Sequence, residues 1–352
     1  MRFAFAPYRL LFKEPGGTSR GVMTEKPTFL VKVFDENDPE HFGIGEAAVF
    51  PGLSPEADGN YVNKLIEVMA NVALGLPTDL TRHSSIQFGL EQAILDFSND
   101  CKGIYYPGDF TQGKSEIIIN GLVWMGDFDR MIERIREKVG AGFHCLKLKI
   151  GAIDWDKELE MLHFIRNSFN ENELTIRVDA NGAFNDKDAL QRLNDLSQLS
   201  IHSIEQPVKS GQTELMAYIC RVSPIPVALD EELIGKGTEE ERKKTLDVIK
   251  PAYIILKPAL CGGFSGASEW ISLADERNIG WWITSALESN IGLNAIAQWT
   301  AQLGVSMPQG LGTGGVFSNN FKTPIYLEGE ILKFNPNDKF DYTQFGNLVW
   351  HE

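Results

Sequence analysis

Short apolar runs alternate with amphipathic stretches along the chain from about residue 115 onward. The apolar runs predict strands at 116–125, 145–150, 174–181, 201–207, 225–231, 253–260 and 279–287. Apolar residues at helical spacing predict helices at 128–140, 155–169, 186–199 and 293–303. Repeated strand-then-helix units imply a parallel sheet, and this many of them in ~200 residues favour a closed barrel. An open doubly wound sheet is the weaker alternative, because no glycine-rich dinucleotide fingerprint follows any of these strands.

The first part of the chain has a different pattern. Strands are predicted at 1–11 and 28–34, and helices near 55–74 and 84–101. The two strands precede the two helices, without the alternation seen later in the chain. This part is therefore predicted to be a separate α+β unit.

Two loops are predicted within the α+β unit. Residues 14–27 are rich in glycine, proline and charge, which indicates a mobile loop, and 50–56 form a second one. The predicted domains are the α+β unit at 1–112, a barrel at 113–317, and a C-terminal segment at 318–352 that packs back on the first unit.

A series of polar residues marks the ends of the predicted barrel strands. Each follows an apolar run, and successive members stand one strand–helix unit apart: Lys149, Asp179, Glu205, Asp230, Lys257 and Ser285. The carboxyl ends of barrel strands converge on one mouth, where barrel enzymes hold their chemistry. We therefore expect these side chains to lie close together.

Three of these residues are carboxylates, which would repel each other at one mouth unless a cation joined them. Oxygen ligands select a hard ion such as Mg²⁺. Each carboxylate alone has an ordinary explanation, since Asp179 could be a turn residue and Glu205 could cap a strand. Three in register on consecutive strands favour a metal site instead.

The lysines fall on either side of the carboxylates in strand order. Lys147 and Lys149 are two apart, so both face the same side of their strand, and Lys257 would approach from across the barrel. A solvated edge strand is the alternative explanation for Lys-x-Lys. Neighbouring ammonium groups and a metal would lower the lysine pKa, so that one lysine can act as a base. A metal between opposed lysines suits one reaction type. One lysine removes the proton from the carbon next to a substrate carboxylate, and the metal stabilises the enediolate that forms.

Several motifs around these residues resemble the enolase superfamily in its muconate-lactonizing branch. The stretches that carry the resemblance are KLKIG at 147–151, VDANG at 178–182, IEQP at 204–207, ALDEEL at 228–233 and LKPALCGG at 256–263. GIGEAA at 43–48 and SALESNIGLNAIAQW at 285–299 extend it over the whole chain. The resemblance implies a (β/α)₇β TIM-like barrel covered by an N-terminal α+β capping domain.

The resemblance also implies a metal site. The metal-ligand positions of the family fall on Asp179, Glu205 and Asp230. The implied ion is Mg²⁺, with Mn²⁺ as a substitute. Asn181 and Glu231 are expected to orient these ligands.

The acid/base positions of the family fall on Lys149 and Lys257, with Lys147 in support. A metal-free barrel that forms a Schiff base at Lys257 is a competing hypothesis. It predicts activity that survives a chelator and covalent trapping by borohydride. A non-catalytic binding barrel is a further alternative, but it leaves the series of polar residues unexplained.

Within the superfamily, SALESNIGL at 285–293 is similar to the Ser-Ser-x-Glu-Ser-x-x-Gly stretch of the o-succinylbenzoate synthase family, with Ala286 in place of the second serine. That family dehydrates a succinyl-hydroxycyclohexadiene carboxylate through an enediolate in menaquinone biosynthesis, which makes it a hydro-lyase. Dipeptide epimerases carry an Asp-x-Asp after the last barrel strand to hold the substrate ammonium. The corresponding GLGTGGVF at 310–317 has no acid, which favours the synthase. A dipeptide epimerase or N-acylamino acid racemase stays open as the alternative.

Substrate contacts are predicted from the same motifs and from residue chemistry. Arg20 could pair with a substrate carboxylate, and glycines would let backbone amides approach the ligand. The predicted substrate-binding residues are Arg20, Gly262, Gly263, Ser285, Glu288 and Thr313. Glu288 has a second explanation, because it could cap the helix that follows it.

The amino-acid composition indicates which kinds of partner and which cellular compartment to expect. The chain has 352 residues and a formal net charge of −15, which argues against nucleic acid or an anionic membrane as partner. The four cysteines are scattered, so neither a disulfide framework nor structural zinc is expected, and a cytoplasmic location is favoured. No stretch resembles a signal peptide or a membrane span. The expected partner is a small-molecule carboxylate substrate, and the oligomeric state is left open.

Overall fold

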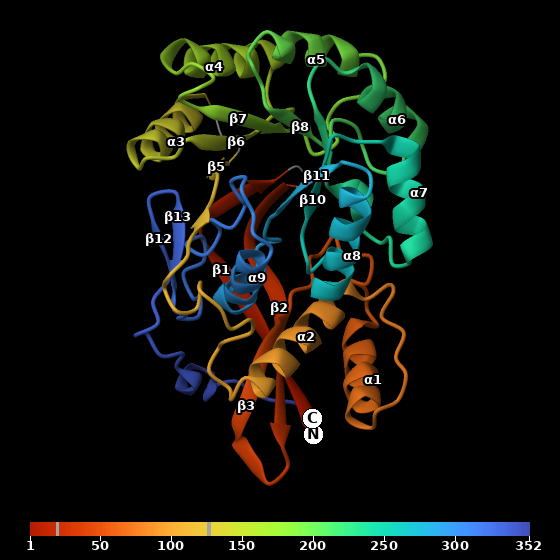
Figure 1. The fold of residues 1–352 in the computed structure, drawn as a ribbon, viewed down its shortest axis with the longest axis vertical. Helices are drawn as coiled ribbons and strands as arrows, with labels where there is room; N and C mark the ends of the chain where they lie inside the picture. Colours follow the sequence, from red (N-terminus) through yellow and green to blue (C-terminus); the bar gives the residue numbers. More distant parts are fainter. Residues whose placement is uncertain (19–20, 125–127) are drawn as a thin grey trace.

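A computed structural model describes residues 1–18, 21–124 and 128–352 of the chain (Figure 1). The N-terminal unit is a three-stranded antiparallel sheet with two helices packed on it. Its strands lie in the order β1 (Arg2–Thr18), β2 (Gly21–Asp35) and β3 (Asp38–Ala47), and its helices are α1 (Tyr61–Ala73) and α2 (Ser84–Ser98). The α+β prediction for this unit is confirmed.

The predicted mobile loop at 14–27 is wrong for most of its length. β1 and β2 run on as a hairpin in which Gly16 pairs with Met23 and Thr18 with Gly21. These residues form strands because β1 and β2 pair with each other, and amino-acid composition does not show which segments will pair. Burial also alternates, and Lys26 and Thr28 on the inner face of β2 are buried. Residues 50–56 form a turn closed by hydrogen bonds from the Leu53 and Ser54 amides to the Phe50 carbonyl.

Among the described residues, seven parallel strands follow, each beside the next in chain order. They are β5 (Gly121–Val123), β6 (Cys145–Lys149), β7 (Thr175–Asp179), β8 (Ser203–Glu205), β9 (Val227–Leu229), β10 (Tyr253–Leu256) and β11 (Gly280–Ile283). Their leucines, isoleucines and valines are buried, as expected for a sheet covered on its outer face.

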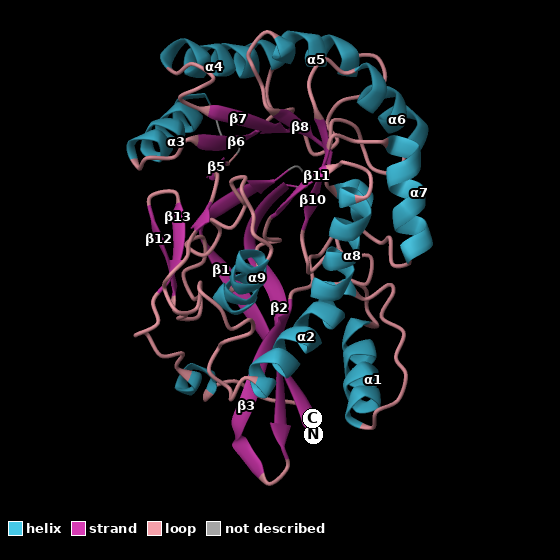
Figure 2. Cartoon of the chain, in the orientation of Figure 1, coloured by secondary structure: helices cyan, strands magenta, loops and turns pink. Residues whose placement is uncertain are grey.

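The α-helices of this region run around the outside of the sheet (Figure 2). They are α3 (Phe128–Gly140), α4 (Trp155–Ser168), α5 (Ala189–Ser197), α6 (Thr213–Val222), α7 (Glu239–Ile249), α8 (Gly263–Asp275) and, after β11, α9 (Asn290–Gln302). The 3₁₀ turn η1 (Glu231–Leu233) instead follows β9 at the carboxyl ends of the strands. The four helices predicted in this region agree with α3, α4, α5 and α9 to within a few residues. In the described part of the chain, no helix has the length and apolar character needed to cross a bilayer.

The sheet closes through a very short final segment. Gly310 bridges to Thr284 beyond β11, and Gln309 bridges to Ile119 just before β5, both in parallel. A Cβ on Gly310 would lie 2.1 Å from the Thr284 hydroxyl oxygen, so only glycine allows this approach. The predicted (β/α)₇β barrel with an N-terminal capping domain is confirmed, and its eighth strand has shrunk to these two residues.

The end of the lumen away from the cap is filled by an aromatic and cationic stack. The Arg177 guanidinium lies 4.1 Å from the centre of the Trp282 ring and donates to the Pro308 carbonyl. His202 stacks on Tyr253 beside it, at 5.2 Å between ring centres. These side chains fill one end of the barrel lumen, so the space for an active site lies at the other end, under the cap.

The C-terminal residues return to the cap. A second small sheet joins β12 (Ile325–Glu328), β13 (Ile331–Phe334) and β4 (Ile117–Ile118), and the 3₁₀ turn η2 (Tyr342–Phe345) follows it. His351 and Phe5 then exchange two backbone hydrogen bonds of 2.8 Å. The first strand of the cap is thus completed by one of the last residues of the chain.

Candidate active site

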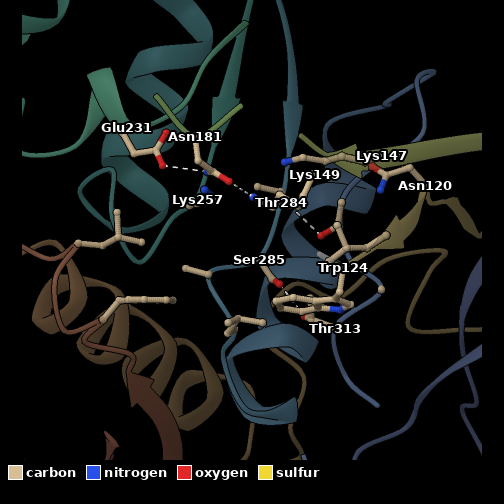
Figure 3. A pocket seen from close by; sticks show the side chains of 17 residues that line it. Asn120, Trp124, Lys147, Lys149, Asn181, Glu231, Lys257, Thr284, Ser285 and Thr313 are labelled. Atoms are coloured by element: carbon tan, nitrogen blue, oxygen red, sulfur yellow. Dashed lines mark hydrogen bonds between the residues drawn. The ribbon is translucent and has the colours of Figure 1, made fainter. Parts of the chain in front are cut away.

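A cavity of about 110 Å³ lies at the carboxyl ends of the barrel strands, beneath the cap. Phe50 and Leu53 close it from the cap side. On the barrel side it is lined by Asn120, Leu122, Trp124, Lys147, Lys149, Asn181, Glu231, Lys257, Thr284, Ser285, Ala286, Leu287, Gly310, Gly312 and Thr313 (Figure 3). All the lysines of the predicted series reach it.

The lysines and carboxylates of the series meet at this mouth. We call these five residues, together with Lys147, the mouth cluster: Lys147, Lys149, Asp179, Glu205, Asp230 and Lys257. Lys149 and Asp179 are register partners on β6 and β7, and Asp179 and Glu205 are partners on β7 and β8. Equal register on neighbouring parallel strands places these side chains at the same height in the lumen.

Every ammonium of the mouth cluster contacts a carboxylate. Lys149 Nζ lies 2.5 Å from Asp179 Oδ2, and Lys147 Nζ lies 2.9 Å from the same oxygen. Lys147 also contacts Glu205, and Lys257 contacts Asp230 from the other side of the barrel. The sequence spacing thus predicts the meeting of these groups, although not which oxygen each ammonium touches.

The direction of the lysine pKa shifts differs from the one expected. Burial alone would lower the pKa of Lys147, but Asp179 and Glu205 outweigh it and raise the pKa. Burial is likewise outweighed at Lys257, where Asp230 and Glu205 raise the pKa. The expectation counted the repulsion between ammonium groups and the metal, but not the carboxylates that touch each ammonium.

The same balance acts on the acids. Burial would raise the pKa of Asp179, but Lys147 and Lys149 hold it below its ordinary value. Burial and the neighbouring Asp179 carboxylate raise the pKa of Glu205 well above its ordinary value. Two carboxylates side by side in a buried site therefore need more positive charge than the lysines provide.

The donor set of the mouth cluster fits a divalent cation. Within the described ranges, no three His, Cys, Asp or Glu side chains already surround one point, because lysine ammonium groups contact the carboxylates. However, Oε1 of Glu205 is buried without a hydrogen-bond partner among the described residues. An unused buried carboxylate oxygen beside a second carboxylate is chemically suited to a hard cation.

Asn181 joins Lys149 to the opposite wall. Its Oδ1 accepts from Lys149 Nζ at 2.6 Å, and its Nδ2 donates to Glu231 Oε1 at 3.0 Å (Figure 3). The Asn181 backbone has a left-handed φ of 44°, which asparagine tolerates better than most residues. Asn181 therefore fixes the direction of the Lys149 side chain.

The predicted substrate contacts divide into two groups. Ser285 and Thr313 line the cavity, with their hydroxyl oxygens 2.5 Å apart. Gly262 and Gly263 do not line it, since they begin α8, where the next amide donates to Glu91 of the cap.

Glu288 is also absent from the cavity lining. It is fully buried, and its Oε2 accepts from the Ala286 amide at 2.7 Å. The helix-cap explanation fails as well, because Ser289 caps α9 by accepting from the Ile291 amide. Arg20 lies outside the described residues, so its predicted role stays a prediction.

Sequence reasoning missed several lining residues. Asn120 is the clearest, because it is buried, lines the cavity and has an Oδ1 without a hydrogen-bond partner among the described residues. It directly follows the apolar run at 117–119 but stands just before β5, the first barrel strand, so the strand-end rule does not find it. The rule points instead to Trp124, which follows β5 and also lines the cavity. Phe50 and Leu53 carried no such signal, because their loop meets the barrel only in the fold.

Comparison with known proteins agrees with this architecture. The Enolase C-terminal domain-like family model matches residues 130–317. The o-succinylbenzoate synthase of Desulfotalea psychrophila is 44% identical, over 94% of this chain and 98% of that protein. The N-succinyl-L-Arg/Lys racemase of Bacillus cereus is 23% identical, over 82% of this chain and 80% of that protein.

A solved structure extends this agreement to three dimensions. The crystal structure of MenC from Desulfotalea psychrophila superposes with a TM-score of 0.84 at 41% identity, over 95% of this chain and 99% of that one. Enolase superfamily enzymes generally use a divalent metal ion, which agrees with the donor set at the mouth. The chain therefore belongs to the enolase superfamily, within the family of the Desulfotalea psychrophila o-succinylbenzoate synthase.

Proposed function

We propose that this chain is an o-succinylbenzoate synthase, a hydro-lyase that dehydrates a succinyl-hydroxycyclohexadiene carboxylate to the aromatic product. The observation that carries the proposal is the 44% identity to a protein of that name over nearly the full length of both chains. The opposed lysines at the cavity supply the matching chemistry.

The character of the cavity wall supports a dicarboxylate substrate. Gly310, Gly312 and Thr313 form the wall where a dipeptide epimerase would need an acid for the substrate ammonium. Glu231 is the single acid among the described lining residues, and Asn181 already donates to it. The described lining therefore offers no second acid to hold a substrate ammonium, so a dicarboxylate substrate suits it better than an ammonium-bearing one.

Lys149 is the proposed base. Held by Asn181, its neutral amine removes the proton from the carbon next to the substrate carboxylate. The electrons left on that carbon then expel the hydroxyl group, which leaves with a proton as water, and the ring becomes aromatic. Lys257, on the opposite wall, stabilises the negative charge of the enediolate.

Asp179, Glu205 and Asp230 are the proposed ligands of Mg²⁺, for which Mn²⁺ could substitute. When bound, the ion supplies positive charge that stabilises the enediolate. Glu231 and Asn181 keep the residues around these ligands in place.

A direct assay tests the function. The purified chain with Mg²⁺ should convert the cyclohexadiene substrate into o-succinylbenzoate, followed by the change in ultraviolet absorption on aromatisation. Lys149→Ala and a sample without divalent metal are the matched controls. Absence of the aromatic product from wild-type protein with Mg²⁺ would overturn the proposal.

N-acylamino acid racemisation is the second candidate. Lysines on opposite walls can remove a proton from one face of a carbon and return one to the other face. An N-succinyl amino acid racemase is among the similar proteins, and the lack of an acid in the Gly310–Thr313 part of the described lining favours an N-succinylated substrate over a dipeptide. Exchange of the α-proton of such a substrate in D₂O, without loss of water, would identify this activity.

A further inference from the structure

Three ionisable side chains are buried together where the cap meets the barrel. Lys26 lies on β2, Glu46 lies on β3, and Glu288 precedes α9, and each is 0% exposed. None of the three lines the cavity. We call them the junction cluster.

Glu46 ties the cap to the start of α9. Its Oε1 accepts from the Ser289 amide at 3.0 Å, and its Oε2 accepts from the Ser289 hydroxyl at 2.6 Å and the Gly292 amide at 3.1 Å. A Cβ on Gly292 would lie 2.9 Å from Glu46 Oε2, so glycine is needed there. A carboxylate at a helix N-terminus satisfies free amides and the helix dipole, which makes this contact a fixed one.

Glu288 and Lys26 each keep an unused polar group. Glu288 Oε2 accepts from the Ala286 amide, whereas its Oε1 has no hydrogen-bond partner in the described ranges. Lys26 Nζ has none there either, and lies 5.7 Å from the centre of the Phe50 ring. The two side chains interact electrostatically, since Lys26 lowers the pKa of Glu288 that burial raises.

These groups lie directly behind the cavity wall. Ser285, Ala286 and Leu287 line the cavity on the barrel side, and Phe50 lines it on the cap side. Leu287 has a left-handed φ of 60°, an unusual conformation for leucine. The bond from the Ala286 amide to Glu288 spans this residue and holds the wall in that shape.

We infer that Glu288 is a positioning residue that holds the Ser285–Leu287 wall of the active site, and that Lys26 is the counter-charge that keeps its carboxylate in place. Through Lys26 and Glu46 the cap thereby acts on the barrel wall from behind, at positions that do not line the cavity. The expected effect on substrate affinity rests on the proposed synthase function, whereas the expected effect on the wall itself does not.

Three variants can distinguish the effect of an unpaired buried charge from the effect of losing the Glu288 bond to the Ala286 amide. Glu288→Leu removes both the charge and the bond to Ala286 and leaves Lys26 next to Glu46 alone. Lys26→Met/Glu288→Leu removes the ammonium as well, and neutral replacement of a buried charge pair is often tolerated. Glu288→Gln removes the charge but keeps an oxygen that can accept from the Ala286 amide.

The KM of the cyclohexadiene substrate should follow the bond to Ala286. We expect Glu288→Leu and the double variant to raise KM about tenfold with a smaller change in kcat, and Glu288→Gln to stay close to wild type. Thermal stability should follow charge instead, so the double variant should melt higher than Glu288→Leu. Glu91→Gln, which alters a cap contact to α8 away from this wall, is the control and should leave KM unchanged.

Hydrogen exchange of the Ala286 amide, measured without substrate, is the second readout. It should quicken in Glu288→Leu and in the double variant but not in Glu288→Gln. Recovery of normal KM and normal exchange in the double variant would overturn the inference, because stability alone would then explain the effects. If Glu288→Leu does not fold, the double variant and Glu288→Gln give the same comparison. If wild-type protein shows no dehydration, the exchange data alone decide.

Discussion

The molecule buries two clusters of lysines and carboxylates that use the same residue types differently. In the mouth cluster, Lys147, Lys149 and Lys257 each contact a carboxylate and each line the cavity. In the junction cluster, Lys26 touches no acceptor in the described part of the chain, and Glu46 is bound by backbone amides and hydroxyls.

The difference lies in what holds each carboxylate. A carboxylate held by ammonium groups can exchange them for a metal ion or a substrate, because those partners are mobile side chains with full charge. A carboxylate held by amides at a helix start cannot move without breaking the backbone contacts of two domains. The mouth cluster is therefore suited to binding a metal ion or a substrate, and the junction cluster is suited to holding the cap on the barrel.

The largest difference in activity between variants of the two clusters should come from removing the proposed base, Lys149. Lys149→Ala is expected to lower kcat by about 10²–10⁴-fold, because general-base catalysis contributes about that much. Circular dichroism should show the fold intact. Lys243→Ala, which removes an exposed lysine paired with Glu239 on α7, is the control and should leave the rate unchanged. Near-normal turnover in Lys149→Ala would remove the role assigned to this lysine.

Removal of the metal ion should affect the mouth cluster and leave the junction cluster unchanged. Dialysis against a chelator is expected to abolish turnover, and Mg²⁺ should restore it, because the proposed ligands all belong to the mouth cluster. Hydrogen exchange at Ala286, next to the junction cluster, should not change. Full activity after chelation, with borohydride trapping at Lys257, would favour the Schiff-base alternative instead.

Removing the amide-bound carboxylate should affect stability. Glu46→Ala leaves the Ser289 and Gly292 amides and the Ser289 hydroxyl buried without the acceptor that each has now. At about 1–3 kcal/mol for each unsatisfied group, the loss should be about 4 kcal/mol in the free energy of unfolding. Urea unfolding measures it, and Glu239→Gln on the surface should change the midpoint little. An equal effect of both variants would contradict the comparison.

The smallest predicted effect is a pH dependence of stability. Burial raises the pKa of Glu288 to about 7, against the lowering effect of Lys26, and Glu46 raises it further. The folded state thus binds this proton more tightly than the unfolded state, so the contribution is fully present below the ordinary glutamate pKa of about 4.3 and is lost as pH rises through about 7. The total change should be about 4 kcal/mol, spread over the interval between the two pKa values at no more than about 1.4 kcal/mol per pH unit. Glu288→Gln should flatten the profile, and an unchanged slope in that variant would rule out this assignment.

Local pattern predicted much of the barrel and its mouth. Strand and helix periods placed the repeating units, and the strand-end rule brought Lys149, Asp179 and Glu205 to one height without any knowledge of the fold. The rule works because parallel neighbours share a direction, so position along each strand becomes position in space.

Features that depend on distant partners were not predictable in the same way. The 14–27 segment has the composition of a loop, but pairing between β1 and β2 overrides it and buries Lys26. The pKa of Lys147 depends on which carboxylate oxygens it touches, and the wall role of Glu288 depends on the cap behind it. The final barrel segment is only two residues long, too short for any periodic signal.

The pairing of Phe5 with His351 has a consequence for biosynthesis. Arg2 and Glu352, 350 positions apart, also form a hydrogen bond of 2.6 Å beside it. Domains usually fold in the order in which the ribosome makes them. Here the cap is translated first, yet its outer strand acquires these partners only after the whole barrel has been translated. The cap strand β1 should therefore reach its final protection from proteases later than the barrel strands that are translated after it.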